Sequence, residues 1–201
     1  QANSVGEPLL DTFGVPKIVT GMVIALLCFA VIVGGVKRIG AFASKIVPAM
    51  AFFYVVGALL MIIIHIGEVP AAFATIFSDA FSGTAATGGV FSNEAGLGSA
   101  PIAHGAAQTK EPVREGLVAM LGPFIDTLVI CTMTALAIIL TGAFTMKGAD
   151  GSGLTGAVLT KTAFKTGMPF AGGEYIVTIG IIFFAFSTII AWSYYGDRSA
   201  R

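Results

Sequence analysis

The chain has 201 residues, of which 56% are hydrophobic and 11% are charged, whereas an ordinary globular protein has roughly 25% charged residues. This composition excludes a soluble protein, and 11 basic residues balanced by 11 acidic ones leave no basic surface for nucleic acid. The 26 glycines follow no three-residue period, which excludes collagen and indicates glycine inside packed apolar structure, as in membrane proteins.

Four stretches with few charges predict transmembrane helices. A charge at the bilayer centre costs about 2.5 kcal/mol or more, so charged residues mark the ends of spans. Residues 18–36 carry no charge and reach roughly 28 Å as a helix, close to the thickness of the hydrocarbon layer. The stretches 46–64, 117–141 and 175–196 also suffice to cross. We therefore expect an all-α polytopic membrane protein with a single transmembrane domain.

A fifth segment, residues 68–108, is mostly small and apolar but lacks a clean apolar run. If the chain crosses the membrane here, seven basic residues fall on one side and four on the other; otherwise the division is six against five. The positive-inside rule therefore favours five crossings, with the first residues outside. The predicted cytoplasmic residues are Lys37, Arg38, Lys45, Lys110, Arg114, Arg198 and Arg201.

The cysteines and the first residues carry no chemical or targeting signal. Cys28 and Cys131 lie in apolar runs, where a thiol packs as a small hydrophobe, so we expect no disulfide, metal ligand or nucleophile. No basic region precedes an apolar stretch after Gln1, so no signal peptide is visible. We expect a fragment of a longer protein.

The fifth segment contains five glycines between Gly83 and Ser99. Each costs a helix about 1 kcal/mol relative to alanine, so we expect a break. Broken backbone at membrane depth is tolerated where it lines a polar cavity, which indicates a binding site. Close packing of small residues between helices is the alternative, and the glycines alone do not decide.

Polar residues follow these glycines. Ser92 or Asn93 can cap a short helix that has Glu94 in its first turn. The alternative is that Asn93 and Glu94 form hydrogen bonds to a moving cytoplasmic gate or to a polar substrate route. The pattern by itself favours capping.

Asp126 is the only ionisable residue well inside one of the four spans. Such a residue is a candidate cation ligand, proton carrier or gate, and structural pairing with a lysine or a backbone group is the alternative. Pro123 frees a backbone carbonyl nearby and can kink this helix.

The last span places Thr188 and Trp192 four residues apart, on one helical face. The hydroxyls of Ser187 and Thr188 are suitable ligands for a hard cation such as sodium. Alternatively, these hydroxyls bond back to their own helix, and Trp192 joins Tyr194 and Tyr195 in an interfacial aromatic belt. The spacing alone favours the belt.

Residues 89–104, Gly-Val-Phe-Ser-Asn-Glu-Ala-Gly-Leu-Gly-Ser-Ala-Pro-Ile-Ala-His, closely resemble the signature of the alanine or glycine:cation symporter family, the sodium:alanine symporters. The resemblance continues through residues 108–116, and it extends to residues 37–48, 122–127 and 188–196. Nearly the whole chain resembles the middle of such a transporter.

The resemblance implies a leucine-transporter-type fold, in which two inverted five-helix repeats hold substrate and sodium beside broken helices. The first two spans then correspond to helices four and five, the glycine-rich segment to helix six, and the last two spans to helices seven and eight. It also reverses the preference for a belt at Trp192. The implied substrate-binding residues are Thr188, Trp192, Gly88, Gly89 and Phe91. The implied sodium ligands are Ser187 and Thr188, and the gating or coupling residues are Asp126, Asn93 and Glu94.

Two departures from the family pattern limit this transfer. Family members carry a longer stretch between the Thr-Gly-Gly element and the Phe-Ser-Asn-Glu element, whereas Gly89 is here separated from Phe91 only by Val90. The helices expected before residue 1 and after residue 201 are missing. We therefore expect that this chain alone does not transport.

The predicted function is symport of sodium with a small neutral amino acid, alanine or glycine, across the cell inner membrane by alternating access. Sodium is the expected coupling ion, and the expected partners are the amino acid, membrane lipid and the missing helices. A channel or structural membrane subunit is the alternative, although a channel filter is normally a ring repeated in an oligomer. An intramembrane aspartyl protease would need two membrane aspartates, and only Asp126 qualifies. We therefore expect no enzyme.

Overall fold

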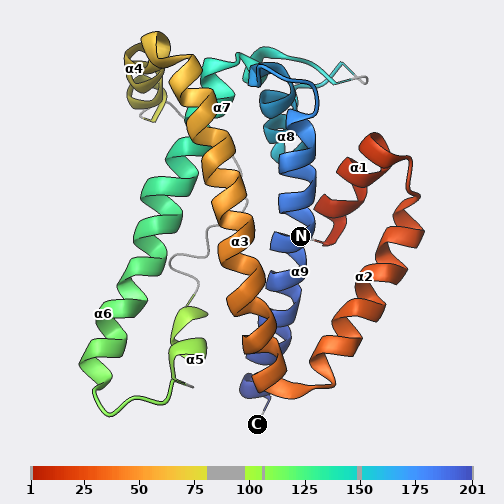
Figure 1. Cartoon of the computed structure of the whole chain (residues 1–201), viewed down its shortest axis with the longest axis vertical. Coiled ribbons are helices and arrows are strands. Elements are labelled where there is room, and N and C mark those ends of the chain that lie inside the picture. The colour runs from red at the N-terminus through yellow and green to blue at the C-terminus, as the bar shows by residue number, and fades with distance from the viewer. Residues whose placement is uncertain (1, 81–97, 106, 149–150, 201) are drawn as a thin grey trace.

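The computed structural model describes residues 2–80, 98–105, 107–148 and 151–200. Over these residues the chain is helical, with one isolated bridge between Lys147 and Gly153, so the predicted all-α class is confirmed. Long helices run along the long axis of the molecule, with the shorter helices α4 and α8 at its upper end and α5 near its lower end (Figure 1). Three helical stretches are long and apolar enough to cross a membrane: Ser44–Ile64, Pro112–Leu140 and Gly173–Ser199.

The first long helix is shorter than predicted. α1 (Ala2–Phe13) leads into α2 (Lys17–Ile32), whose 16 residues reach only about 24 Å at 1.5 Å per residue. The predicted C-terminal boundary of the span 18–36 is wrong, because α2 ends at Ile32 and the chain turns at Gly34 and Gly35. Gly35 adopts a φ of +72°, a left-handed conformation that favours glycine.

α3 (Gly35–Ile64) contains the predicted span 46–64 and extends it toward the lower end by more than two turns. The chain then passes through the short helix η1 (Ile66–Glu68) into α4 (Val69–Ala80). The remaining described part of the predicted broken segment includes α5 (Ala100–His104). Residues 81–97 lie outside the described part of the chain.

The third long helix contains a wider turn. α6 (Pro112–Pro123), the π-helical segment η3 (Phe124–Cys131) and α7 (Thr132–Leu140) follow one another without interruption. They include the predicted span 117–141 except its last residue. Pro123 has no N–H to donate and its ring crowds the preceding turn. The π-helical segment begins directly after this proline, and such local π adjustments can re-satisfy the backbone groups that a proline frees.

Two helices were not predicted from the sequence. α1 precedes the first predicted span, and α8 (Gly156–Gly167) lies between η4 (Ala143–Thr145) and α9 (Gly173–Ser199). α8 is too short and too polar to resemble a span, but it buries Ala163 and Phe164 completely. It therefore belongs to the packed core at the upper end.

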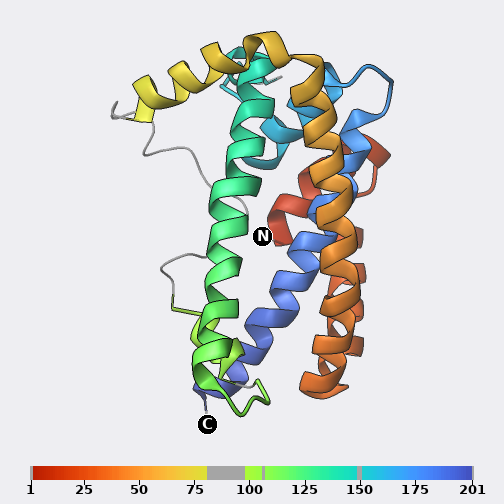
Figure 2. The same ribbon diagram turned by 60° about the vertical axis from the view of Figure 1, so that its left-hand side comes forward.

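The ends of the helices separate the basic residues into two groups. The α2–α3 turn, the α5–α6 connection and the end of α9 lie at the lower end, whereas α4 and α8 lie at the upper end (Figures 1 and 2). α4 and α5 thus lie at opposite ends of the molecule, and the five predicted crossings stay a prediction, because residues 81–97 between these helices lie outside the described part of the chain. The lower elements carry Arg38, Lys110, Arg114 and Arg198, and the upper ones carry Lys147, Lys161 and Lys165.

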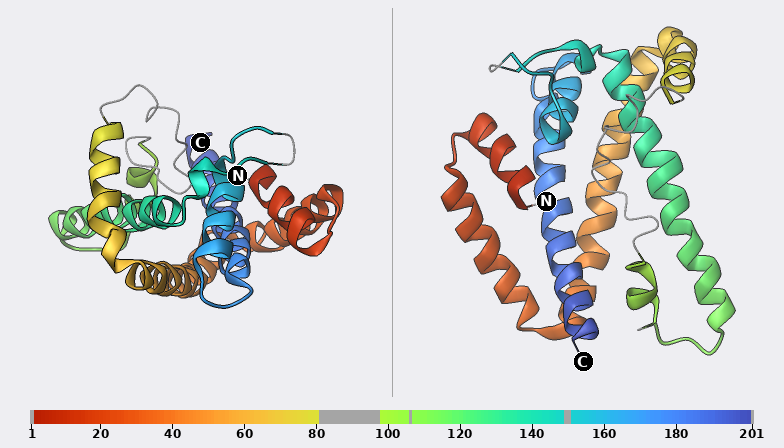
Figure 3. Two further views of the ribbon diagram at one scale, coloured as in Figure 1. Left: turned by 90° about the horizontal axis from the view of Figure 1, so that it is seen from above. Right: turned by 180° about the vertical axis from the view of Figure 1, so that it is seen from behind.

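The core forms around α9, which runs between α3 and the α1–α2 pair (Figure 3). Val177, Ile181 and Ile190 of α9 are buried, and they belong to one cluster with Met61 of α3 and Phe164 of α8. Burial of each such side chain contributes about 1.5–3 kcal/mol. α9 is therefore the element on which the other helices assemble.

An ion pair that includes a buried ammonium group connects α1 to α8. The Lys161 side chain on α8 is 7% exposed and forms an ion pair with Asp11 of α1, whose side chain is 68% exposed. Lys161 Nζ also lies 3.5 Å from the hydroxyl of Thr12, and this hydroxyl is 3.5 Å from that of Thr178 on α9. Three helices therefore meet in one polar contact at the upper end.

We expect Gly173→Ala to destabilise the protein, because a Cβ at Gly173 would overlap the carbonyl oxygen of Phe164 and lie 2.6 Å from Met168 Cγ. Overpacking of this kind costs about 1–3 kcal/mol. Gly180→Ala is the matched control on the same helix, because among the described residues no atom lies within 4 Å of the new Cβ. Thermal melting in detergent should show a lower midpoint for Gly173→Ala alone; equal midpoints would contradict this packing.

We expect Asp11→Asn to lower stability by about 1–2 kcal/mol, less than the ~3–5 kcal/mol of a fully buried pair, because Asp11 is largely exposed. The variant leaves the buried Lys161 ammonium without its carboxylate. Adding Lys161→Met removes that charge and should restore the melting temperature. Glu7→Gln, which breaks the exposed Lys17–Glu7 pair, is the control and should change stability by less than about 1 kcal/mol. A loss no larger in Asp11→Asn than in Glu7→Gln would refute the assignment.

Candidate functional site

The structure describes four of the nine predicted site residues. Asp126 lies in the π-helical segment η3, and Ser187, Thr188 and Trp192 lie on α9. α3 packs against both α7 and α9. The other five residues lie outside the described part of the chain: Gly88, Gly89, Phe91, Asn93 and Glu94.

The hydroxyls of α9 differ in their hydrogen bonds. Ser187 Oγ donates to the carbonyl oxygen of Phe184 at 2.9 Å, and Ser193 Oγ donates to that of Ile190 at 2.6 Å. The back-bonding expected as an alternative is therefore present at Ser187. Donation uses the hydroxyl proton and leaves oxygen lone pairs available to a cation. Within the described residues, the half-buried Thr188 hydroxyl has no hydrogen-bond partner.

Trp192 lies one turn beyond Thr188. α9 is continuous over both residues, so they share one face. The indole is 45% exposed and meets the Tyr195 ring edge to face, with 5.7 Å between the ring centroids. On the neighbouring face, Arg198 lies 5.2 Å from the centre of the Tyr194 ring and donates from Nε to the Tyr194 hydroxyl at 3.1 Å. The last turns of α9 thus form an aromatic cluster.

Asp126 is half buried, and η3 contains no fully buried side chain. The π-helical turn is wider than an α-helical turn and changes the direction in which the following residues point. Such segments are rare and occur frequently at functional sites. The sequence identified Asp126 and the effect of Pro123, but not the π-helical geometry between them.

A tyrosine that the sequence analysis did not select contacts both α7 and α9. Tyr54 of α3 is 7% exposed, and its hydroxyl oxygen lies 2.6 Å from Thr134 Oγ1 on α7. Its ring stacks on Phe164 with 5.4 Å between the ring centroids and meets Phe184 of α9 edge to face at 6.5 Å. A tyrosine in an apolar span was the available signal, because a buried tyrosine hydroxyl normally needs a partner.

A further polar contact lies at the lower end of the molecule. His104 Nδ1 lies 2.7 Å from Glu115 Oε1, which ties α5 to α6 at the lower end. Neither Cys28 nor Cys131 forms a disulfide. Among the described residues, no group of three or more His, Cys, Asp or Glu side chains is suited to hold a metal ion. A sodium ion would instead need hydroxyl and carbonyl oxygens.

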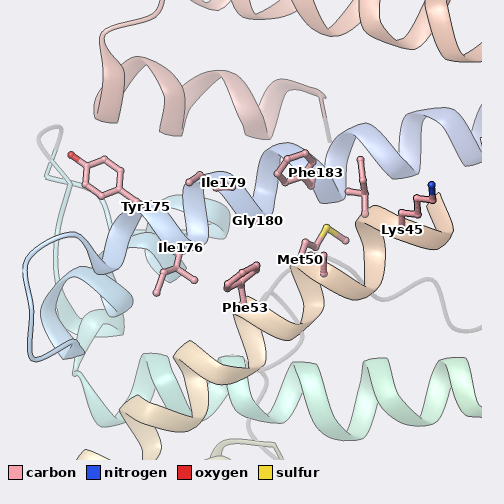
Figure 4. Close-up of a pocket in the computed structure, with 10 residues that line it drawn as sticks. Lys45, Met50, Phe53, Tyr175, Ile176, Ile179, Gly180 and Phe183 are labelled. Carbon is pink, nitrogen blue, oxygen red and sulfur yellow. The ribbon is translucent and has the colours of Figure 1, made fainter. Parts of the chain in front are cut away.

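A groove of about 450 Å³ lies between α3 and α9 (Figure 4). Its walls are almost entirely apolar, with Met50 and Phe53 on α3 facing Ile176 and Phe183 on α9, and with Lys45 at one end. None of the described predicted site residues lines it. Because its lining offers almost no polar partners, this groove does not suit a ligand with charged groups at both ends, such as an amino acid.

Comparison with known proteins identifies the family. The model of the sodium:alanine symporter family matches residues 1–201. The chain belongs to this family. The resemblance seen in the sequence is thereby confirmed, and because the family consists of transporters, the chain is not an enzyme.

Three relatives illustrate the similarity. The sodium/alanine symporter AgcS of Methanococcus maripaludis is 46% identical over 211 residues, which cover 98% of this chain and 46% of AgcS. An uncharacterized transporter of Haemophilus influenzae is 45% identical over 215 residues, with 98% and 46% covered. YrbD of Bacillus subtilis, named as a candidate sodium/proton-dependent alanine carrier, is 36% identical over 220 residues, with 99% and 45% covered.

The chain spans about half the length of the curated relatives it matches. The alignments of 211 to 220 residues are longer than the 201 residues of the chain. The relatives therefore carry residues inside the matched region that this chain lacks. This difference agrees in direction with the short Gly89–Phe91 connection, which lies outside the described residues.

Proposed function

We propose that the chain is the central part of a transporter that couples the inward movement of sodium to uptake of a small neutral amino acid, alanine or glycine. The observation that carries this proposal is the family match over the whole chain, together with a relative that is named a sodium/alanine symporter. Three apolar helices of membrane-spanning length support a location in the membrane.

The proposed architecture is a leucine-transporter-type fold within a single transmembrane domain. α2 and α3 correspond to helices four and five, the α6–α7 helix to helix seven, and α9 to helix eight. Two inverted repeats of five helices need partners before α1 and after α9. The length of the relatives supports such additional helices, and the transport activity belongs to the complete protein.

The orientation follows from the basic residues. The lower end of the molecule carries Arg38, Lys110, Arg114 and Arg198, and basic loops remain on the cytoplasmic side of a membrane. We therefore orient the lower end toward the cytoplasm and α8 toward the outside. The membrane is the cell inner membrane, and its lipid surrounds the exposed apolar side chains.

In the proposed site, Ser187 and Thr188 supply hydroxyl oxygens to sodium. Thr188 and Trp192 contact the amino acid together with Gly88, Gly89 and Phe91. The Thr188 hydroxyl supports this assignment, because it is half buried and has no hydrogen-bond partner among the described residues, so its oxygen lone pairs are available to a ligand. Coupling or gating is assigned to Asp126, Asn93 and Glu94.

Sodium can drive accumulation only if it binds one conformation better than another. A cation beside the substrate carboxylate offsets the cost of burying that charge, so each ligand favours binding of the other. Alternating access then carries both across together. A channel would instead conduct without this mutual dependence.

We expect the complete transporter that contains this chain to accumulate radiolabelled alanine in proteoliposomes when an inward sodium gradient is applied. Uptake should saturate with alanine and fail without sodium. A second version, with the longer stretch of a relative inserted between Gly89 and Phe91, tests whether the short connection is compatible with transport.

Flux that does not saturate would favour a channel. Uptake driven by a proton gradient without sodium would show that the proton, and not sodium, is the coupling ion. Activity only in the version with the longer stretch would identify the natural sequence as an inactive deletion. Uptake in neither version would contradict the proposed function.

We expect Thr188→Val to raise the half-saturating sodium concentration by about tenfold or more, because a polar contact to a charged group contributes about 1.5–3 kcal/mol. Valine keeps the shape and removes the hydroxyl. Ser193→Ala is the matched control, since Ser193 also lies on α9 but is outside the proposed sodium site. Sodium activation curves of uptake measure both; an unchanged Thr188→Val curve would exclude Thr188 as a ligand.

A further inference from the structure

We propose that Tyr54 is a positioning residue. It fixes the orientation of the π-helical segment that contains Asp126 relative to the turn of α9 that contains Ser187. This inference rests on the proposed function and adds a residue that touches neither sodium nor the amino acid. Tyr54 is 7% exposed at the junction of α3, α7, α8 and α9.

The direction of the hydrogen bonds follows from counting protons. Thr134 Oγ1 donates its only proton to the carbonyl oxygen of Ile130 at 2.8 Å. The contact of 2.6 Å between the two hydroxyls must therefore be a donation from Tyr54 to Thr134. Ile130 lies in the last turn of the π-helical segment. A chain of two hydrogen bonds thus connects α3 to the backbone of that segment.

The aromatic ring of Tyr54 extends this connection to α9. Its edge-to-face partner is Phe184, and the carbonyl oxygen of Phe184 accepts the hydrogen bond from Ser187 Oγ. Phe164 of α8 is fully buried and stacks on the other side of the tyrosine. The ring is therefore confined from two helices while its hydroxyl bonds to a third.

The π-helical segment needs such a restraint because a change from i+5 to i+4 hydrogen bonding alters the register of the helix by one residue. One residue corresponds to about 100° of rotation in an α-helix. Such a change between Pro123 and Thr134 would turn Asp126 toward a different neighbour. A hydrogen bond at the end of the segment opposes this rotation, and its loss favours the alternative register.

Four variants of the complete transporter test this role. Tyr54→Phe removes only the hydroxyl and keeps the ring contacts, and Thr134→Val removes both hydrogen bonds. Thr134→Ser keeps both and serves as the rescue. Thr141→Val is the matched control, because Thr141, the residue directly after α7, donates to the carbonyl oxygens of Ala137 and Ile138 but, among the described residues, to no other helix.

The first measurement is hydrogen–deuterium exchange of the backbone amides of residues 124–131, which does not depend on transport. We expect exchange to be about three- to tenfold faster in Tyr54→Phe and Thr134→Val, the range that one net hydrogen bond provides. Thr134→Ser and Thr141→Val should behave like the unmodified protein. Unchanged exchange in Tyr54→Phe would overturn the inference, whatever the transport activity.

The second measurement is the half-saturating sodium concentration of alanine uptake, which we expect to rise about threefold or more in the same two variants. Faster exchange with unchanged sodium activation would leave Tyr54 only a structural role and overturn positioning. If the unmodified protein shows no sodium-dependent uptake, the proposed function fails and positioning fails with it. Because hydrogen exchange does not depend on transport, it shows whether the Tyr54 hydrogen bond restrains the π-helical segment even when uptake fails.

Discussion

Backbone groups in the hydrocarbon layer have no water to bind, so each must find a partner within the protein. This constraint explains why the described chain is helical and why its irregular points are so specific. After Pro123 the helix adopts π-helical bonding instead of ending. Thr134 and Ser187 each donate to a carbonyl of their own helix, and Thr141 donates to the last turn of α7. Two of the described candidate site residues, Asp126 and Ser187, lie at such local adjustments.

The same constraint also favours uncharged polar contacts over charged ones between helices inside the membrane. The ion pair of Lys161 with Asp11 lies at the upper end, and the contact of His104 with Glu115 lies at the lower end. The contact of Tyr54 with Thr134, which also joins two helices, uses two hydroxyls, which are cheaper to bury than charges. Asp126 is the exception, and its position deep in a span is the reason to assign it a function.

Charge patterning predicted most of the long helices, because charged residues other than Asp126 lie near the ends of the predicted spans. It could not predict α8, because a segment of twelve residues with two lysines resembles a loop in the sequence. Its burial depends on a tertiary contact, the stacking of Phe164 on Tyr54. Charge patterning placed the end of the first span too late, because Gly34 and Gly35 are uncharged and their turn depends on backbone conformation. Family motifs selected Thr188 and Trp192 as candidate site residues, which stay a prediction. Tyr54 has no motif, and its role depends on residues 80 and 130 positions away in the chain.

The turn between α2 and α3 fixes where these two helices must stay together. Two residues separate Ile32 from Gly35, so the Cα atoms of Ile32 and Gly35 can lie at most about 11 Å apart. The lower end of α2 therefore follows any displacement of the lower end of α3, whereas the other ends of the two helices can change their separation by bending at Gly34 and Gly35. A rearrangement that shifts α3 as a whole, and Tyr54 with it, also moves α2 at its lower end.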